Sequence, residues 1–207
     1  LGAIVHTRTI VDPLVGVKIN GKVGEKETIA SIYALDELVE EEDYAHFSII
    51  RYKHALSQDG FLGGFYTGRH HGNSYNVVLG MDGQLRINPS SLFGYHLFLS
   101  QTKHDGQPQK ENGHALGLHY EYTTRDWMMM LGFQDIGQDF WTETGYITRP
   151  GISRLRVGIL RMFYPQSKIM RRIDPMIHST QIRDKFADLC ETDNSFDLRF
   201  ILWRSSI

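Results

Sequence analysis

The chain has 207 residues, a net charge of −2 and an apolar fraction of 41%, which is a folding composition rather than a disordered one. This charge gives no reason to expect a nucleic acid as a partner. The single cysteine, Cys190, excludes an internal disulfide and a cysteine-based metal cluster. No run of about twenty apolar residues occurs, which excludes a transmembrane helix but not a transmembrane β-barrel, whose strands are only half apolar.

Apolar and polar residues alternate along most of the chain, with the period of a β-strand. The clearest stretch is residues 74–87, where the odd positions are mostly apolar and the even positions mostly polar. Val78 is the only large apolar residue at an even position. In chain order the alternation predicts strands at about 14–24, 26–35, 45–56, 60–69, 74–87, 91–103, 114–123, 127–135, 152–164, 168–180 and 195–203. The one helix-like run, residues 33–43, is short and acidic, and we interpret it as a loop or a single helical turn.

The connections between these strands alternate between two kinds. Four are short turns of the sequences SQDG, NPSS, TTRD and YPQS, and the others are longer polar links at about 36–44, 69–74, 103–113, 136–151 and 181–194. In an up-and-down meander, alternate connections lie at opposite ends of the sheet. The short turns are therefore expected at one end and the long links at the other, as in outer-membrane barrels.

These patterns predict an all-β fold in a single domain over residues 1–207. We expect an antiparallel up-and-down meander of about 10–12 strands that forms a transmembrane β-barrel or a large part of one. Strands of ten or more residues reach across a bilayer when they are tilted. Large aromatic residues lie near the expected strand ends, where an interfacial girdle would place them: Tyr75, Tyr122, Trp127, Tyr164 and Trp203.

A soluble meander barrel that binds a small apolar ligand would give a similar pattern. In that alternative Val77, Leu79, Leu116 and Leu118 would surround a dry cavity. In the membrane barrel the same residues would face lipid. The charged residues and glycines that alternate with them would line a hydrated interior.

Several tracts resemble a known family. In order they are FSIIRYKHAL, GFLGGFYTGR, YNVVLGMDGQLRI, LFGYHLFLSQTK, GHALGLHYEY and GQDFWTETGYITRPGI. The chain resembles the C-terminal region of the DUF5916 family of bacterial envelope proteins over about residues 14–164. The most specific tract has the form G-x-D-F-x-x-E-x-G-F/Y-x-x-R, matched by Gly137, Asp139, Phe140, Glu143, Gly145, Tyr146 and Arg149.

The resemblance implies an outer-membrane β-barrel in the bacterial cell envelope. In the family, a carbohydrate-binding-like β-sandwich precedes the barrel. We therefore expect this sequence to be a piece of a longer chain from which that sandwich is missing. No reaction is established for the family, so the resemblance implies no enzymatic activity for this chain. The expected role is to bind or pass a solute that is linked to carbohydrate.

Residues 136–151 combine aromatic and charged side chains in one long link between two expected strands. The functional interpretation is a loop in which Asp139, Glu143 and Arg149 make polar contacts with a ligand, while Trp141 and Tyr146 offer surfaces for stacking. The structural interpretation is a fixed loop in which Arg149 pairs with Asp139 or Glu143.

Arg86, His119 and Glu121 complete the candidate ligand-binding set. His119 and Glu121 lie two apart on one strand face and could share a ligand, and Arg86 belongs to a set of inward charges that either fills the interior or selects a solute. A metal site needs three or four converging ligands, and the sequence places only two together, His119 and Glu121. We therefore expect no metal site and no cofactor. The expected partners are membrane lipid and a carbohydrate or another small solute.

An enzyme is the alternative from another class, namely a cell-surface hydrolase with its site in the long loops. No G-x-S-x-G motif occurs, and a glycosidase needs two carboxylates that the sequence cannot place. No catalytic residue is assigned.

Overall fold

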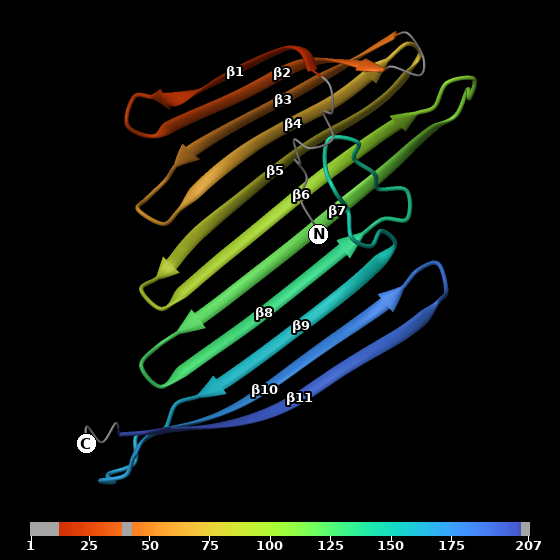
Figure 1. Ribbon diagram of the computed structural model, residues 1–207. Helices are drawn as coiled ribbons and strands as arrows, with labels where there is room; N and C mark the ends of the chain where they lie inside the picture. The colour runs from red at the N-terminus through yellow and green to blue at the C-terminus, as the bar shows by residue number, and fades with distance from the viewer. Residues whose placement is uncertain (1–12, 39–42, 204–207) are drawn as a thin grey trace.

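The computed structural model describes residues 13–38 and 43–203. Eleven β-strands in these residues form one antiparallel sheet, in which each strand pairs with its neighbours in the chain (Figure 1). They are β1 (Pro13–Val23), β2 (Glu27–Leu38), β3 (Asp43–Ala55), β4 (Phe61–His71), β5 (Ser74–Asn88), β6 (Ser91–Lys103), β7 (Lys110–Thr123), β8 (Trp127–Ile136), β9 (Ile152–Arg161), β10 (Met170–Asp184) and β11 (Leu189–Leu202).

This architecture confirms the all-β meander that the alternation predicted. The sheet of described strands is open, with β1 and β11 at its two edges, and this arrangement is consistent with a large part of a barrel. Within the described residues, no helix has the length and apolar character needed to cross a membrane.

The connections alternate between the two ends of the sheet. Residues 24–26, 56–60, 89–90, 124–126 and 162–169 lie at one end, which we call the turn end. The described connections at the other end, which we call the loop end, are 72–73, 104–109, 137–151 and 185–188. The four short turns named from the sequence do share one end, as predicted.

Four sequence predictions about the loop end were wrong in extent. The link at 103–113 is shorter, at 104–109, because β7 begins at Lys110. The link at 69–74 is a tight turn between β4 and β5, where Gly72 has a φ of 52° that suits glycine. The link at 181–194 is a hairpin, because β10 and β11 extend to a turn at 185–188. The acidic run at 33–43 is strand over residues 33–38, and its residues 39–42 lie outside the described part of the chain.

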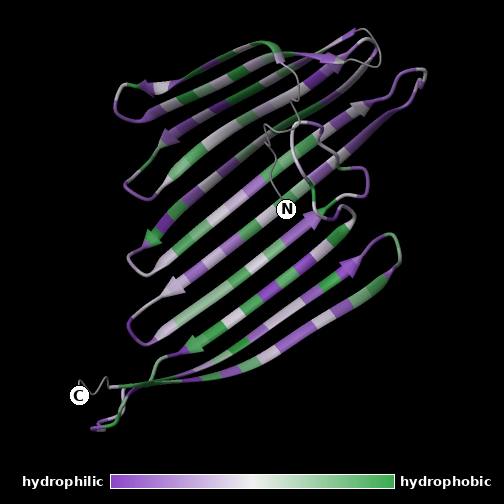
Figure 2. Ribbon diagram, viewed as in Figure 1, coloured by the Kyte–Doolittle hydropathy of each residue, from purple (hydrophilic) through white to green (hydrophobic). Residues whose placement is uncertain are grey.

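The two faces of the sheet differ because residues 137–151 fold back over one of them. We call this the covered face and the opposite one the bare face. Figure 1 shows the segment lying in front of the middle strands, and Figure 2 shows polar and apolar residues alternating along the strands.

The core lies between the covered face and this segment. Phe140 and Ile147 of the segment pack in one buried cluster with residues of the sheet: Ile49, Phe65, Val78, Phe98, Ala115, Ile136 and Ile152. Val78, which interrupts the alternation in the sequence, is fully buried in this cluster. Its apolar character therefore reflects the segment that lies on it.

Candidate functional site

The segment 137–151 alternates between side chains that face the sheet and side chains that face away from it. Phe140, Thr142 and Thr144 are buried, whereas Trp141 and Tyr146 are 48% and 61% exposed. Asp139 is also exposed. The segment therefore anchors itself with one side and presents aromatic and acidic groups on the other.

Glycine on β7 allows the segment to come close to the sheet. A Cβ atom at Gly113 would overlap the backbone of Phe140 and the carbonyl oxygen of Asp139. The segment thus contacts the strand by backbone-to-backbone approach, which only glycine permits.

Asn76 on β5 is the main polar anchor. Its fully buried amide accepts a hydrogen bond from the Glu143 N–H at 2.9 Å, and its nitrogen donates to the Trp141 carbonyl at 3.2 Å. Ser100 of β6 accepts from the Trp141 N–H at 3.3 Å. These bonds satisfy backbone groups of the segment that would otherwise be buried without partners.

Side-chain contacts reinforce this anchoring. The Thr67 hydroxyl donates to the Thr144 hydroxyl at 2.6 Å. Arg69 pairs with the Glu143 carboxylate at 2.9 Å, with both side chains 25% exposed. Glu143 is therefore held by a cation and, through its backbone, by Asn76.

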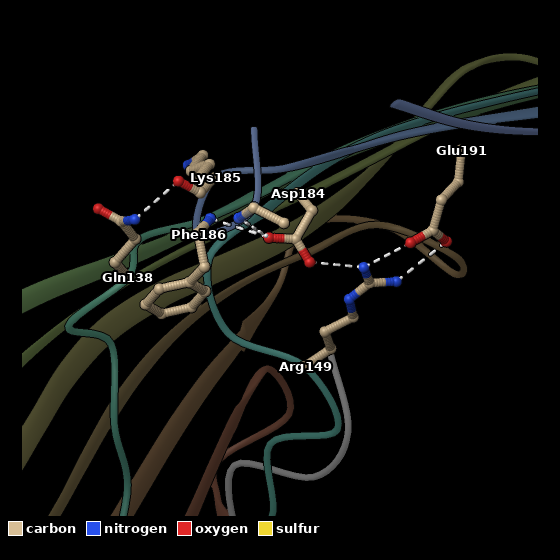
Figure 3. A network of polar contacts seen from close by, with 7 residues as sticks. Gln138, Arg149, Asp184, Lys185, Phe186 and Glu191 are labelled. Carbon is tan, nitrogen blue, oxygen red and sulfur yellow. Dashed lines mark hydrogen bonds and ion pairs between the residues drawn. The ribbon is translucent and has the colours of Figure 1, made fainter. Parts of the chain in front are cut away.

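Arg149 ties the end of the segment to the β10–β11 hairpin. Its guanidinium donates to Asp184 at 2.6 Å and to both oxygens of Glu191, at 2.6 and 3.1 Å (Figure 3). Nearby, the Gln138 amide donates to the carbonyl of Lys185 at 2.9 Å. The hydrogen bonds to Glu191, which have the larger effect, and to Asp184 raise the pKa of Arg149 above its usual value.

The structural interpretation of this loop was right in kind and wrong in partners. Arg149 does pair with carboxylates, but with Asp184 and Glu191 rather than with Asp139 or Glu143. The sequence could not reveal this pairing, because both partners lie more than thirty residues further along the chain.

Two clefts flank the segment at the loop end, and His104 belongs to both. The smaller, about 270 Å³, is lined by His104, Glu111, Gln138, Asp139, Phe140, Trp141 and Pro150. The larger, about 630 Å³, is lined by Asp43, Arg69, His71, Gly72, Asn73, Ser74, His104, Asp105 and Glu143. We call the two together the loop-end clefts.

The smaller cleft combines an exposed indole with two carboxylates and an amide. The larger is polar throughout and brings Arg69 and Glu143 together with histidine and aspartate side chains. Such groups suit a solute that carries hydroxyl or charged groups, because an aromatic face packs on its carbon skeleton while polar side chains bond its oxygens.

The sequence-predicted residues fall into two groups. Asp139, Trp141, Glu143, Tyr146 and Arg149 all lie on the segment at the loop end. Of these, Asp139, Trp141 and Glu143 line the clefts, whereas Arg149 makes structural contacts.

Arg86, His119 and Glu121 lie toward the turn end. Arg86 pairs with Asp59 at 3.0 Å, and the His119 ring nitrogen lies 2.8 Å from the Glu121 carboxylate. His119 and Glu121 thus bond each other.

Sequence reasoning missed several residues that build the site. His104 and Glu111 line the clefts, and Arg69, Asn76 and Gly113 position the segment. One signal was available: Val78 is a large apolar residue among the polar residues of one strand face, which indicates that this part of the face is covered.

Comparison with known proteins identifies no relative, since no protein-family model, curated protein or solved structure matches the chain.

Proposed function

We propose that the chain forms much of the wall of a β-barrel in a bacterial outer membrane, and that it binds or passes a polar solute, such as a carbohydrate, at the loop-end clefts. The bare face would contact lipid, and the covered face would line the interior. The resemblance of several sequence tracts to the DUF5916 family points to the same assignment.

The observation that carries the proposal is the composition of the bare face. Large apolar side chains there are exposed on consecutive strands instead of being packed into a core. They include Val15, Val17, Ile19, Leu79, Met81, Leu99, Leu118, Leu131, Phe133, Leu155, Ile159, Ile177, Phe196, Leu198 and Phe200. An apolar surface this extensive is not stable in water and requires an apolar partner.

The covered face is more polar, although Ala34, Ala45 and Phe47 form a second small buried cluster on it. Beyond the segment it carries ion pairs, such as Arg51 with Asp82 at 2.7 Å, and further charged strand residues such as Arg156 and Asp197. Lipid-facing and interior-facing residues alternate in this way in membrane barrels.

The alternatives fit these contacts less well. Leu79 and Leu118 lie on the bare face, opposite the segment, so they do not surround a dry cavity as an apolar-ligand barrel would require. A hydrolase would need free carboxylates, and Glu143 is paired with Arg69.

The membrane assignment is tested by arginine substitutions at two outward positions of β7. Leu118→Arg places a charge in the proposed hydrocarbon and should cost about 2–4 kcal/mol of folding free energy in lipid. Asn112→Arg, nearer the loop end of the same strand, should cost about 0–1 kcal/mol. Urea unfolding in phosphatidylcholine vesicles measures both, and equal costs would contradict the assignment.

The solute assignment is tested with oligosaccharides as probes. Trp141→Ala and Asp139→Asn should each weaken oligosaccharide binding measured by calorimetry. Tyr164→Ala removes an exposed aromatic group at the turn end and should leave binding unchanged. Hydrolysis of the probe that disappears in Asp139→Asn would instead support the hydrolase.

A further inference from the structure

The apolar residues of the bare face do not lie at the same height along every strand. We call residues level with each other when strand pairing connects them across the sheet. On β5 the outward apolar stretch extends from Val77 to Ile87, and on β11 it extends from Phe196 to Leu202. Strand pairing allows the two stretches to be compared directly.

Followed through the pairing, Phe196 lies level with the turn-end terminus of β5. The chain of partners is Phe196, Ile177, Ile159, Met129, Tyr122, Ser91 and Asn88. The apolar stretch of β11 therefore begins where that of β5 ends.

The displacement continues in the same direction on the other side of β5. Val15 of β1 lies level with Tyr75, and Val23 lies level with Gly83, through successive partners on β2, β3 and β4. The β1 stretch is thus shifted toward the loop end relative to Val77–Ile87. From β1 to β11 the apolar belt moves toward the turn end by about one residue per strand.

This displacement has a geometric meaning. With a rise of about 3.3 Å per residue and about 4.8 Å between strands, a displacement of one residue per strand corresponds to an inclination of about 35°. Strands of membrane barrels are tilted by about 35–45°. At a tilt of about 35° the stretch Val77–Ile87 spans about 27 Å along the membrane normal, close to the usual apolar band of about 25 Å.

A single row of paired residues shows the boundary of the belt. The row is Met81, Leu97, Leu116, Asp135, Ser153, Arg183 and Cys190, and it changes from apolar to polar between β7 and β8. Asp135 is paired with Lys185 at 2.8 Å and with His114 at 2.8 Å, as expected of groups outside hydrocarbon.

We propose that the bare face binds bilayer hydrocarbon along a belt that crosses the strands obliquely, so that the loop-end halves of β10 and β11 project beyond the membrane. The inference rests on the proposed membrane location and adds where the bilayer lies. Met81 and Leu198 are then in hydrocarbon, whereas Arg183 and Cys190, level with Met81, are in water.

The test uses spin labels on the protein in phosphatidylcholine vesicles. The native Cys190 is exposed and carries one label directly. Met81→Cys and Leu198→Cys, each in a Cys190→Ser background, carry the other two. Collision of each label with oxygen, which concentrates in hydrocarbon, is compared with collision with a water-soluble nickel chelate, and heat-dependent gel mobility verifies folding.

The expected result is preference for oxygen at Met81 and Leu198 and reversal of that preference at Cys190. If Cys190 behaves as Met81 does, the belt is not oblique and the inference is overturned, although the membrane location stands. If all three labels prefer the nickel chelate, the membrane location itself fails.

Discussion

At the scale of single residues, the side chains that interrupt a simple strand pattern are the ones that receive the segment 137–151. Val78 and Asn76 lie on the covered face of β5, and Gly113 lies on that of β7. Each has a different role: an apolar contact, a pair of hydrogen bonds and room for a backbone. Together they convert one region of a polar face into a core.

Gly113 provides the most direct test of this docking. Gly113→Ala should displace the segment, because the added methyl group overlaps the Phe140 backbone. We expect faster amide exchange at Trp141 and Glu143, measured by NMR in detergent micelles. Gly94→Ala is the matched control, since its Cβ would have only ordinary contacts, the nearest at 3.7 Å. Unchanged exchange in Gly113→Ala would show that the segment is not seated on β7.

Asn76 tests the polar part. Asn76→Ala leaves the buried Glu143 N–H and Trp141 carbonyl without their partner, and it should lower the free energy of unfolding by about 2–3 kcal/mol. The measurement is urea unfolding in vesicles. Asn112→Ala, at an exposed position, should change it by less than about 0.5 kcal/mol. Equal effects of the two substitutions would contradict an anchoring role for Asn76.

At the scale of elements, the segment 137–151 joins parts of the sheet that strand pairing leaves independent. Its first half rests on β4 to β7, and its end bonds β10 and β11 through Arg149. One connection thus joins distant strands at the loop end and contributes part of the wall of each cleft.

Removing the second attachment should loosen the end of the segment. Arg149→Ala eliminates the bonds to Asp184 and Glu191, so chymotrypsin should cleave after Trp141 and Tyr146 faster than in the unmodified protein. Arg183→Ala is the control, because Arg183 pairs with exposed Asp188 at the same end without contacting the segment. Equal cleavage in the two variants would mean that the Arg149 pairs do not hold it.

At the scale of the whole molecule, the sheet has two open edges that a membrane would not tolerate. Unpaired backbone groups in hydrocarbon cost several kcal/mol each. In the described meander β1 and β11 run in the same direction, since ten reversals separate them. An antiparallel closure therefore requires an odd number of additional strands between them.

Closure can be measured by amide exchange at the edges. If the proposed barrel closes in a membrane, further strands pair with β1 and β11, and the amides of these strands that point away from β2 and β10 should exchange slowly in lipid vesicles. Amides of β6, which has partners on both sides, serve as the protected reference. Rapid exchange at both edges in lipid would contradict a closed barrel.

The sequence alone determined the all-β meander, its approximate strand positions and the placement of the short turns at one end, because the period-two alternation and turn chemistry are local properties of the chain. The tertiary structure decided which charges pair, why Val78 breaks the pattern and how far the apolar belt is displaced from strand to strand. Those features depend on strand register and on a segment folded across the sheet, and both bring together residues that the sequence keeps far apart.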